Sequence, residues 1–274
     1  MICSDQTRPR IEAAFDAAQN YETHARVQRR VAEALADRIA ALPVVAARGD
    51  TLRLLEIGCG TGLLTRALQD RGIGGHWLVT DIAPRMVSRC ATAMADHAAA
   101  PALTFAVLDG SAPPASLTPG SFDLICSSMA FQWFADLGPA LARLADLLAP
   151  GGTLAFSTLL DGTFAEWEEA HRREGLDAGG LRYPSLHALS GLFPRGGNLS
   201  ARELHARDAY AGAGDFLRAL KRIGAATPRS DHRPLPPASL RRVMKAFDRM
   251  GAAATYRVAL CNWTSPTAKD ELSA

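Results

Sequence analysis

The sequence predicts an α/β fold: a seven-stranded, mostly parallel sheet with helices on both faces and an antiparallel last strand. Between residues 50 and 160, short apolar runs alternate with helical patterns, which is typical of a doubly wound parallel sheet. Apolar and polar residues alternate in 199–211 and 255–263, which indicates two late strands. Helical patterns fill 161–198 and 212–252. We expect one domain in which these helical insertions cap the carboxyl ends of the strands, where open α/β sheets bind ligands.

Residues 1–45 predict an N-terminal helical lid. Across Pro9 to Leu42 apolar residues recur every four positions, so one stripe of the helix faces the protein. Pro43 is expected to end this helix. The residues of the stripe are Val27, Val31 and Leu35.

The elements of the core follow in order. The expected strands are Leu52–Ile57, His76–Asp81, Leu103–Leu108, Phe122–Ser127 and Thr153–Leu159. One expected helix begins at Thr61, and two more cover about Met86–Ala98 and Leu137–Leu148. A Pro150-Gly151-Gly152 turn precedes the strand Thr153–Leu159. Beyond residue 161, four further helical patterns centre on Trp167, Leu189, Leu220 and Val243, and a proline-rich linker over 227–237 separates the last two.

The glycine-rich turn after the first strand is the most informative segment. Gly58, Gly60 and Gly62 occupy alternate positions, so backbone N–H groups can approach a ligand at the start of a helix. Glu56 precedes the turn, and Asp81 ends the next strand, where it can accept hydrogen bonds from both ribose hydroxyls. The spacing differs from the G-x-G-x-x-G dinucleotide fingerprint. A nicotinamide cofactor, or a turn that only packs a helix on a strand, remains an alternative.

This turn with its strand-terminal acid resembles motif I of the class I S-adenosylmethionine (SAM) methyltransferases, whose sheet is Rossmann-like. The resemblance implies a SAM-binding core over 50–160. In this fold a polar residue that ends the third strand reaches the adenine amino group, and the end of the fourth strand faces the sulfonium. An Asp-Gly-Ser string also simply makes turns. The implied cofactor residues are Gln28, Glu56, Gly58, Gly60, Gly62, Asp81, Ile82, Asp109, Gly110, Ser111 and Ser127.

Longer strings make the resemblance more specific. Over nearly its whole length the chain resembles the malonyl-acyl-carrier-protein O-methyltransferases of biotin synthesis, the BioC family. The glycine turn and Pro-Gly-Gly are shared by many SAM enzymes, whereas the strings Tyr21–Arg30 and Phe216–Ala225 are far more restricted. A glycine-rich passage at 175–181 departs from the family pattern. The strings are Phe15 with Tyr21–Arg30, Glu56–Gly62, Met129–Trp133, Pro150–Thr158, Glu166–Trp167 with Ala170, Tyr183–Pro184 and Phe216–Ala225.

The resemblance implies methylation of the free carboxylate of malonyl-acyl carrier protein or malonyl-coenzyme A, with SAM as methyl donor and no metal. A malonyl carboxylate with a pKa of about 4 is ionised at neutral pH, so it needs no general base. Alignment of the reacting atoms in a dry pocket then supplies the catalysis. Two other functions stay open. One is methylation of a quinone or another small acid, and the other is SAM binding without turnover.

A cation must hold the substrate carboxylate. Arg218 and Lys221 share one helix face, opposite an apolar stripe, and a guanidinium can fork onto a carboxylate. Arg218 is the first candidate, with Lys221 and Arg182 in reserve, although a solvated basic face fits the same spacing. Tyr183 is expected to line the acyl channel, and Tyr21 to close it from the N-terminal side.

Tyr21 and Gln28 lie seven residues apart, so both project from one face of the N-terminal helix. They are positioned to hold the methionyl end of SAM, and a solvated polar stripe is the alternative. A carrier protein is expected to meet a basic surface on the helical insertions. Its candidate residues are Arg172, Arg173, Arg195, Arg241, Arg242 and Lys245.

The overall composition excludes several classes of partner. Lys plus Arg (30) nearly balances Asp plus Glu (28), so we expect no nucleic-acid or membrane partner. The five cysteines are odd in number, which fits reduced thiols better than a disulfide framework. The polar start of the chain does not resemble a signal peptide, and the expected location is cytoplasmic.

Overall fold

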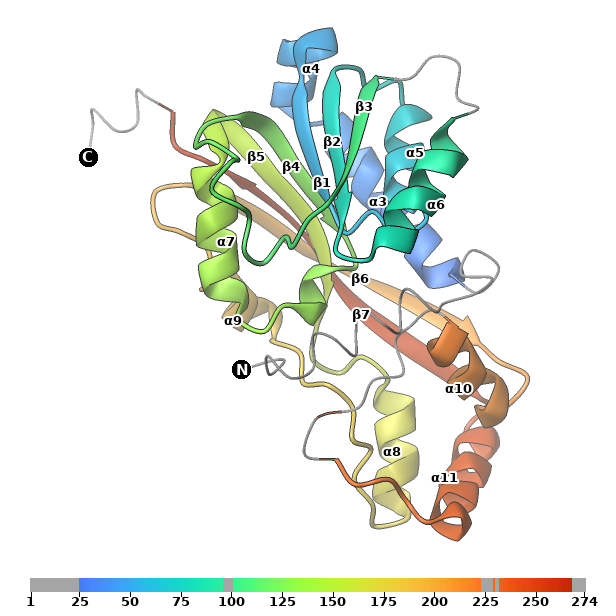
Figure 1. Cartoon of the computed structure of the whole chain (residues 1–274). Coiled ribbons are helices and arrows are strands. Elements are labelled where there is room, and N and C mark those ends of the chain that lie inside the picture. Colours follow the sequence, from blue (N-terminus) through green and yellow to red (C-terminus); the bar gives the residue numbers. More distant parts are fainter. Residues whose placement is uncertain (1–24, 96–100, 223–228, 230–231, 268–274) are drawn as a thin grey trace.

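The computed structural model describes residues 25–95, 101–222, 229 and 232–267, and it is organised around a single sheet (Figure 1). The seven strands lie in the order β3-β2-β1-β4-β5-β7-β6. Pairing is parallel from β3 to β5, and β7 is antiparallel to both of its neighbours. The predicted fold class is confirmed. The strands are β1 (Arg53–Ile57), β2 (His76–Asp81), β3 (Ala102–Val107), β4 (Phe122–Ser128), β5 (Leu148–Leu159), β6 (Asn198–Ala209) and β7 (Ala253–Thr264).

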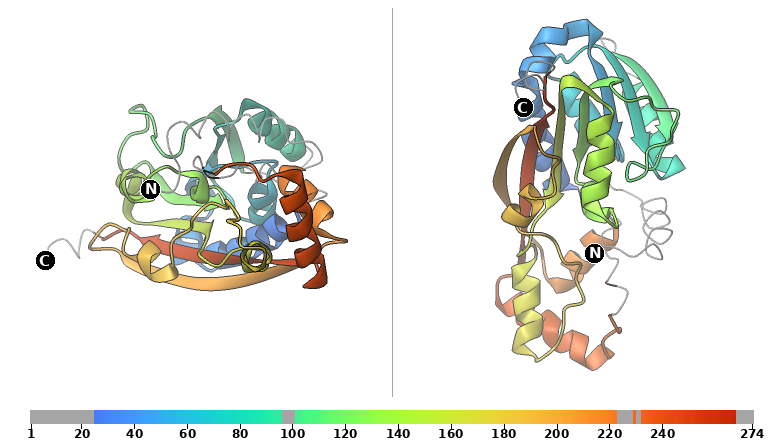
Figure 2. Two further views of the ribbon diagram at one scale, coloured as in Figure 1. Left: turned by 90° about the horizontal axis from the view of Figure 1, so that it is seen from below. Right: turned by 90° about the vertical axis from the view of Figure 1, so that its left-hand side faces the viewer.

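Helices cover both faces of this sheet (Figures 1 and 2). One hydrophobic core joins the sheet to α3, α5 and α6, and a second core on the other face joins it to α7 and α9. In the part of the chain that is described, no helix has the length and hydrophobicity needed to cross a membrane. The helices are α3 (Arg26–Ala40), α4 (Pro43–Arg48), α5 (Leu63–Gln69), α6 (Pro84–Met94), α7 (Leu137–Asp146), α8 (Ala165–Arg173), α9 (Leu186–Ser190), α10 (Ala213–Arg222) and α11 (Pro237–Arg249), with short 3-10 turns η2 (Gly49–Thr51) and η3 (Phe131–Trp133).

The two cores follow from the two-residue period of the strands. Leu54 and Leu124 belong to the core beneath α3 and α5, whereas Leu55 and Ile125 belong to the core beneath α7. All four side chains are fully buried. The central strands therefore read as continuous apolar runs, as expected for parallel strands covered on both faces.

Three helices form a separate cap cluster. The rings of Trp167 in α8, Phe216 in α10 and Phe247 in α11 lie 5.2 to 5.4 Å apart, pair by pair. These aromatic contacts hold the helices together at the lower end of the molecule in Figure 1, away from the N-terminal ends of β1 to β5.

Of two local predictions, one was confirmed and one was wrong. α3 ends at Ala40, just before Pro43, as predicted, and Pro43 then begins the further helix α4, where its missing N–H costs no hydrogen bond. The Pro150-Gly151-Gly152 segment lies inside β5 instead of forming a separate turn before it. The register of β4 with β5 shifts between Phe122 and Leu124. Residues 150–152 therefore form an irregularity within β5, with Gly151 at φ 75°.

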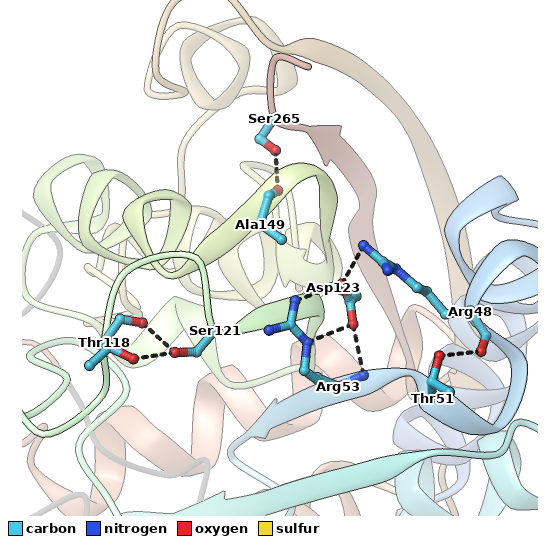
Figure 3. A network of polar contacts seen from close by, with 8 residues as sticks. All are labelled: Arg48, Thr51, Arg53, Thr118, Ser121, Asp123, Ala149 and Ser265. Atoms are coloured by element: carbon cyan, nitrogen blue, oxygen red, sulfur yellow. Dashed lines mark hydrogen bonds and ion pairs between the residues drawn. The ribbon is translucent and has the colours of Figure 1, made fainter. Parts of the chain in front are cut away.

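A buried carboxylate ties β1 to β4 at the N-terminal end of the sheet (Figure 3). Asp123 is 1% exposed and accepts hydrogen bonds from the Arg53 backbone N–H (3.0 Å), Nε (3.0 Å) and Nη2 (2.9 Å). Nη2 of Arg48 lies 3.1 Å from the same carboxylate. Burial raises the pKa of Asp123, but the hydrogen bonds from Arg53 outweigh burial and the pKa is lowered.

Candidate functional site

The glycine turn between β1 and α5 requires left-handed backbone at each of its three glycines. The φ angles of Gly58, Gly60 and Gly62 are 71°, 55° and 89°. A Cβ on Gly58 would lie 2.5 Å from the Cβ of Ala130, whereas a Cβ on Gly60 would meet no atom within 4 Å. Gly58 therefore allows close packing, and Gly60 borders open space.

The other predicted glycines have packing reasons. A Cβ on Gly62 would lie 3.1 Å from Sγ of Cys90, and one on Gly110 would lie 2.1 Å from Cγ2 of Ile57. Gly110 thus allows the segment after β3 to approach the end of β1. That contact explains the glycine without a ligand.

Asp81 holds the end of β2 against the glycine turn. Its side chain is 8% exposed, and its two oxygens accept hydrogen bonds from the backbone N–H groups of Gly60 and Ala83, each at 2.9 Å. Burial raises the pKa of Asp81, opposed by these N–H groups and that of Ile82. A carboxylate offers about four acceptor positions, so capacity remains for one further donor such as a hydroxyl.

Glu56 is a buried carboxyl group beneath the turn. It is 1% exposed, and Oγ1 of Thr65 donates to its Oε2 at 2.8 Å. Burial raises the pKa of Glu56 to about 7, the Thr65 hydrogen bond opposes this, and the neighbouring charge of Asp81 adds to it. Near neutral pH this group therefore holds a proton that an exposed glutamate would have lost.

Replacing Glu56 with glutamine is expected to change how stability depends on pH. Because the folded-state pKa is raised, the wild-type free energy of unfolding should fall by about 2–3 kcal/mol as pH rises from about 4.5 to about 7. Glutamine keeps the acceptor for Thr65 and does not ionise, so the variant should lose this dependence. Urea unfolding at pH 5 and pH 8 measures it. The matched control is Asp136→Asn at an exposed carboxyl group, and equal pH slopes in wild type and Glu56→Gln would refute the expectation.

A small pocket lies directly against the glycine turn. Its volume is about 30 Å³, enough for one polar end of a ligand. Oγ1 of Thr61 in its wall is buried and has no hydrogen-bond partner among the described residues. Gln28 of α3, 8% exposed, also lines it. Thr61 thus offers a hydroxyl, Gln28 an amide and Glu56 an ionisable carboxyl group to the same small pocket. Together these groups fit a polar, positively charged end of a ligand. The lining residues are Gln28, Glu56, Gly58, Cys59, Gly60, Thr61, Leu63, Leu64 and Ser128.

Three residues predicted to bind the cofactor from the ends of β3 and β4 do not line this pocket: Asp109, Ser111 and Ser127. Oδ1 of Asp109 accepts hydrogen bonds from the backbone N–H (2.9 Å) and Oγ (2.7 Å) of Ser111, which forms a local turn. Ser127 is fully buried, and its hydroxyl has no partner in the described part of the chain. The adjacent Ser128, which sequence reasoning missed, lines the pocket instead.

Two clefts lie in the cap, beyond the glycine-turn pocket. The apolar cap cleft has a volume of about 370 Å³ and lies between α8, α10, α11 and the segment 178–183. Its walls include Phe164, Trp167, Leu217, Leu220 and Leu240. The charged cap cleft, about 620 Å³, includes Asp161, Glu168, Arg172, Asp177, Arg182 and Arg229. Tyr183 and Gly180 border both clefts.

The proposed substrate cations are not brought together with the glycine turn. The Arg218 side chain is 62% exposed, with Nη2 3.7 Å from Oδ1 of Asp215, and it borders neither cap cleft. Lys221 is exposed on the same helix. Arg182, the reserve candidate, borders the charged cap cleft next to Tyr183. Tyr21 lies outside the described residues.

Other chemistry has little support in the described part of the chain. No group of three or more His, Cys, Asp or Glu residues there is arranged to hold a metal ion. Cys59, Cys90, Cys126 and Cys261 are free and buried. Burial raises the pKa of Cys126 well above the ordinary thiol value, so this thiol is not an activated nucleophile.

Comparison with known proteins agrees with this site. A family model described as "Methyltransferase domain" matches residues 55–154, which include the glycine turn and Asp81. The chain is 39% identical over 251 residues to a malonyl-[acyl-carrier protein] O-methyltransferase of Magnetococcus marinus, covering 91% of this chain and 90% of that protein.

Two further similarities concern a fused protein and the fold. The chain is 47% identical over 258 residues to the biotin biosynthesis bifunctional protein BioCD of Bordetella avium. The matched region covers 93% of this chain and 52% of the Bordetella avium protein, so the chain spans about half the length of that relative. The crystal structure of the YcgJ protein from Bacillus subtilis matches with a TM-score of 0.57 at 16% identity, over 84% of this chain and 99% of that one. That likeness shows the fold alone.

Proposed function

Because the chain belongs to the malonyl-[acyl-carrier protein] O-methyltransferase family, we propose that it methylates the free carboxylate of a malonyl thioester in biotin synthesis. The enzyme is a SAM-dependent methyltransferase. The observation that carries the proposal is the glycine turn with Asp81 and the polar pocket beside it, inside a chain that matches a named relative over nine-tenths of both lengths. The proposed carrier is acyl carrier protein, and malonyl-coenzyme A is the alternative thioester.

Residues on both sides of the turn would hold the donor. Asp81 would accept a hydrogen bond from the ribose, since its carboxylate keeps acceptor capacity beyond the N–H groups of Gly60, Ala83 and Ile82. Thr61 and Gln28 offer a hydroxyl and an amide to the amino-acid end. Glu56, once ionised, would complement its positive charge.

SAM, when bound, supplies an electrophilic methyl group on a sulfonium. The malonyl carboxylate is already ionised at neutral pH, so the protein's task is to orient this oxygen and exclude water. Phe131 is fully buried, and it forms an aromatic group at the end of β4 with Phe134 and Phe156, whose ring centroids lie 4.7 and 4.6 Å from its own. Such apolar rings keep the neighbouring strand end dry.

Arg182 is the better supported clamp for the substrate carboxylate, because it borders a cap cleft beside Tyr183, whereas Arg218 borders neither cleft. Arg182→Ala is expected to raise KM for malonyl thioesters about 10- to 100-fold, the loss of one charge-assisted hydrogen-bonded pair, without changing SAM affinity. Arg218→Ala is the matched comparison. If Arg218→Ala alone raises KM, the clamp lies on α10, as first predicted.

Three of the arginines predicted to contact a carrier protein already form ion pairs within this chain. Arg172 and Arg173 both pair with Glu169, and Arg242 pairs with Glu174. Arg241 and Lys245 on α11 are exposed and make no ion pair with the described residues. These two side chains support α11 as the proposed contact for an acidic partner.

The proposed function is tested with SAM that carries a labelled methyl group. Malonyl-acyl carrier protein or malonyl-coenzyme A should be labelled, and acetyl thioesters, which lack a free carboxylate, should not. Succinyl thioesters test selectivity for acid length. Saponification should release labelled methanol, because the product is an ester. Label in the acetyl thioester, or label that survives alkali, refutes carboxyl methylation, and no transfer to any acceptor would indicate SAM binding without turnover.

A further inference from the structure

We propose that the apolar cap cleft binds the pantetheine arm of the thioester substrate, so that the malonyl carboxylate lies towards Arg182 in the adjoining charged cap cleft. This inference rests on the proposed function and adds a subsite to it. The arm is a flexible, uncharged chain that carries two amides, a gem-dimethyl group and the thioester sulfur.

The apolar cap cleft adjoins the donor side of the site. Leu63 lines the glycine-turn pocket and also packs against the cap cluster of α8, α10 and α11. Phe164 and Tyr183 line the apolar cap cleft and pack against the core that contains Cys59 of the glycine turn. Leu63 and Phe164 thus each pack against both the cap cluster and the core beneath α3 and α5.

Phe164, in the wall of the apolar cap cleft, is held in an unusual conformation. Its φ is 64°, in the left-handed region that non-glycine residues rarely adopt. Its N–H donates to the carbonyl of Thr255 at 2.8 Å, and its ring contacts Tyr256 and Phe216 edge-on, at centroid distances of 4.7 and 5.5 Å. Backbone strain of this kind is kept where surrounding contacts fix it, and it clusters at ligand sites.

The size and lining of the cleft fit the arm better than the acid. A volume of about 370 Å³ is within the range of ligand pockets, and the short malonyl group alone would leave most of it empty. The walls are mainly leucine and aromatic side chains, and the polar groups among them include Glu168, His171 and His232. Burial raises the pKa of Glu168, which favours its uncharged form. Nδ1 of His171 lies 2.9 Å from the carbonyl of Trp167, and burial lowers the pKa of this imidazole, so it is neutral at neutral pH. An uncharged arm suits this environment, whereas a carboxylate suits the neighbouring charged cap cleft.

Gly180 gives a direct way to obstruct the cleft. It borders both cap clefts, its φ is not left-handed, and an added Cβ would meet no atom within 4 Å. A side chain is therefore tolerated by the fold and projects into open space. Gly180→Trp is the test variant and Gly180→Ala is its matched control. Leu217→Trp obstructs the cleft independently from the α10 wall.

The experiment compares malonyl-coenzyme A, which has the whole arm, with malonyl-N-acetylcysteamine, which keeps only its thiol end. Leu217→Trp, at a residue that borders the apolar cap cleft and not the charged one, is expected to lower kcat/KM for malonyl-coenzyme A about tenfold or more, and to change the truncated substrate less than about twofold. Gly180→Trp, which also obstructs the charged cap cleft, should lower kcat/KM for both substrates. Gly180→Ala should match wild type with both. Equal losses for both substrates in Leu217→Trp, or no loss for either in that variant, overturn the proposal.

A binding measurement keeps the test independent of turnover. Free pantetheine should change the tryptophan fluorescence of the wild-type protein, since Trp167 lines the cleft, and Trp167→Phe should remove this signal. Absence of any change in wild type contradicts the inference. If pantetheine binds and no malonyl thioester is methylated, the proposed function fails while the arm site stands. If both thioesters are methylated and obstruction has no effect, the arm site fails alone.

Discussion

Asp123→Ala is expected to lower the free energy of unfolding by about 2–4 kcal/mol, because it removes the carboxylate that holds two arginines and one backbone N–H. Removing one partner of a fully buried ion pair usually costs more than this. The expected loss is smaller here because the side chains of Arg48 and Arg53 are 47% and 44% exposed and can be hydrated after the change. The N–H of Arg53 at the start of β1 also loses its acceptor. Equilibrium unfolding in urea measures the loss.

The control is Arg48→Ala, which removes a single contact of a half-exposed side chain and should cost less than about 1 kcal/mol. The pH dependence gives a second check. Because the pKa of Asp123 is lowered in the folded protein, its contribution is present above about pH 4 and is lost as pH falls through the folded-state pKa. The difference between wild type and Asp123→Asn should therefore shrink in acid. Equal stability of the two at pH 7 would show that the pair contributes nothing.

Gly58→Ala is expected to cost about 2–5 kcal/mol of stability and to abolish measurable SAM binding. The backbone at φ 71° penalises any side chain, and the new Cβ would lie 2.5 Å from the Cβ of Ala130. The turn or the 3-10 segment after β4 must shift to relieve this contact, and both lie at the candidate site. Thermal unfolding and calorimetric titration with SAM measure the two effects.

Two controls separate the causes. Gly60→Ala has the left-handed penalty without the clash, since a Cβ there meets no atom within 4 Å, so it should retain most of the stability while placing a methyl group beside the pocket. The double variant Gly58→Ala with Ala130→Gly removes the clash and should recover part of the loss. A double variant as unstable as Gly58→Ala alone would assign the cost to backbone conformation and not to Ala130.

The sequence predicted the sheet well because strand patterns depend on neighbours a few residues away. His76–Asp81 was predicted with its observed bounds, and the antiparallel orientation of β7 was also predicted. The helix end before Pro43 was predicted but the new helix after it was not, and the 150–152 segment was misassigned, because proline and glycine serve at helix starts and strand irregularities as well as at ends and turns. Only the packing around them decides which role they take.

The site was less predictable, because periodicity tells which residues share a face but not what that face meets. Arg218 does lie opposite the apolar side of α10, yet its own side chain faces solvent and borders neither cap cleft. Ser127 and Ser128 differ by one position along β4, and the pleat sends only Ser128 to the pocket. Thr61 lies inside the recognised motif, and its unsatisfied hydroxyl becomes visible only when burial is known.

The position of β7 between β5 and β6 has a consequence for how the protein is made. Residues 253–264 pair with both neighbours, so β5 has an open edge until this late segment emerges from the ribosome. A chain truncated before Ala253 would leave β6 unattached and the fully buried Ala155 to Phe156 strip of β5 exposed to pairing with other molecules. Premature termination should therefore yield aggregates and not a smaller active enzyme.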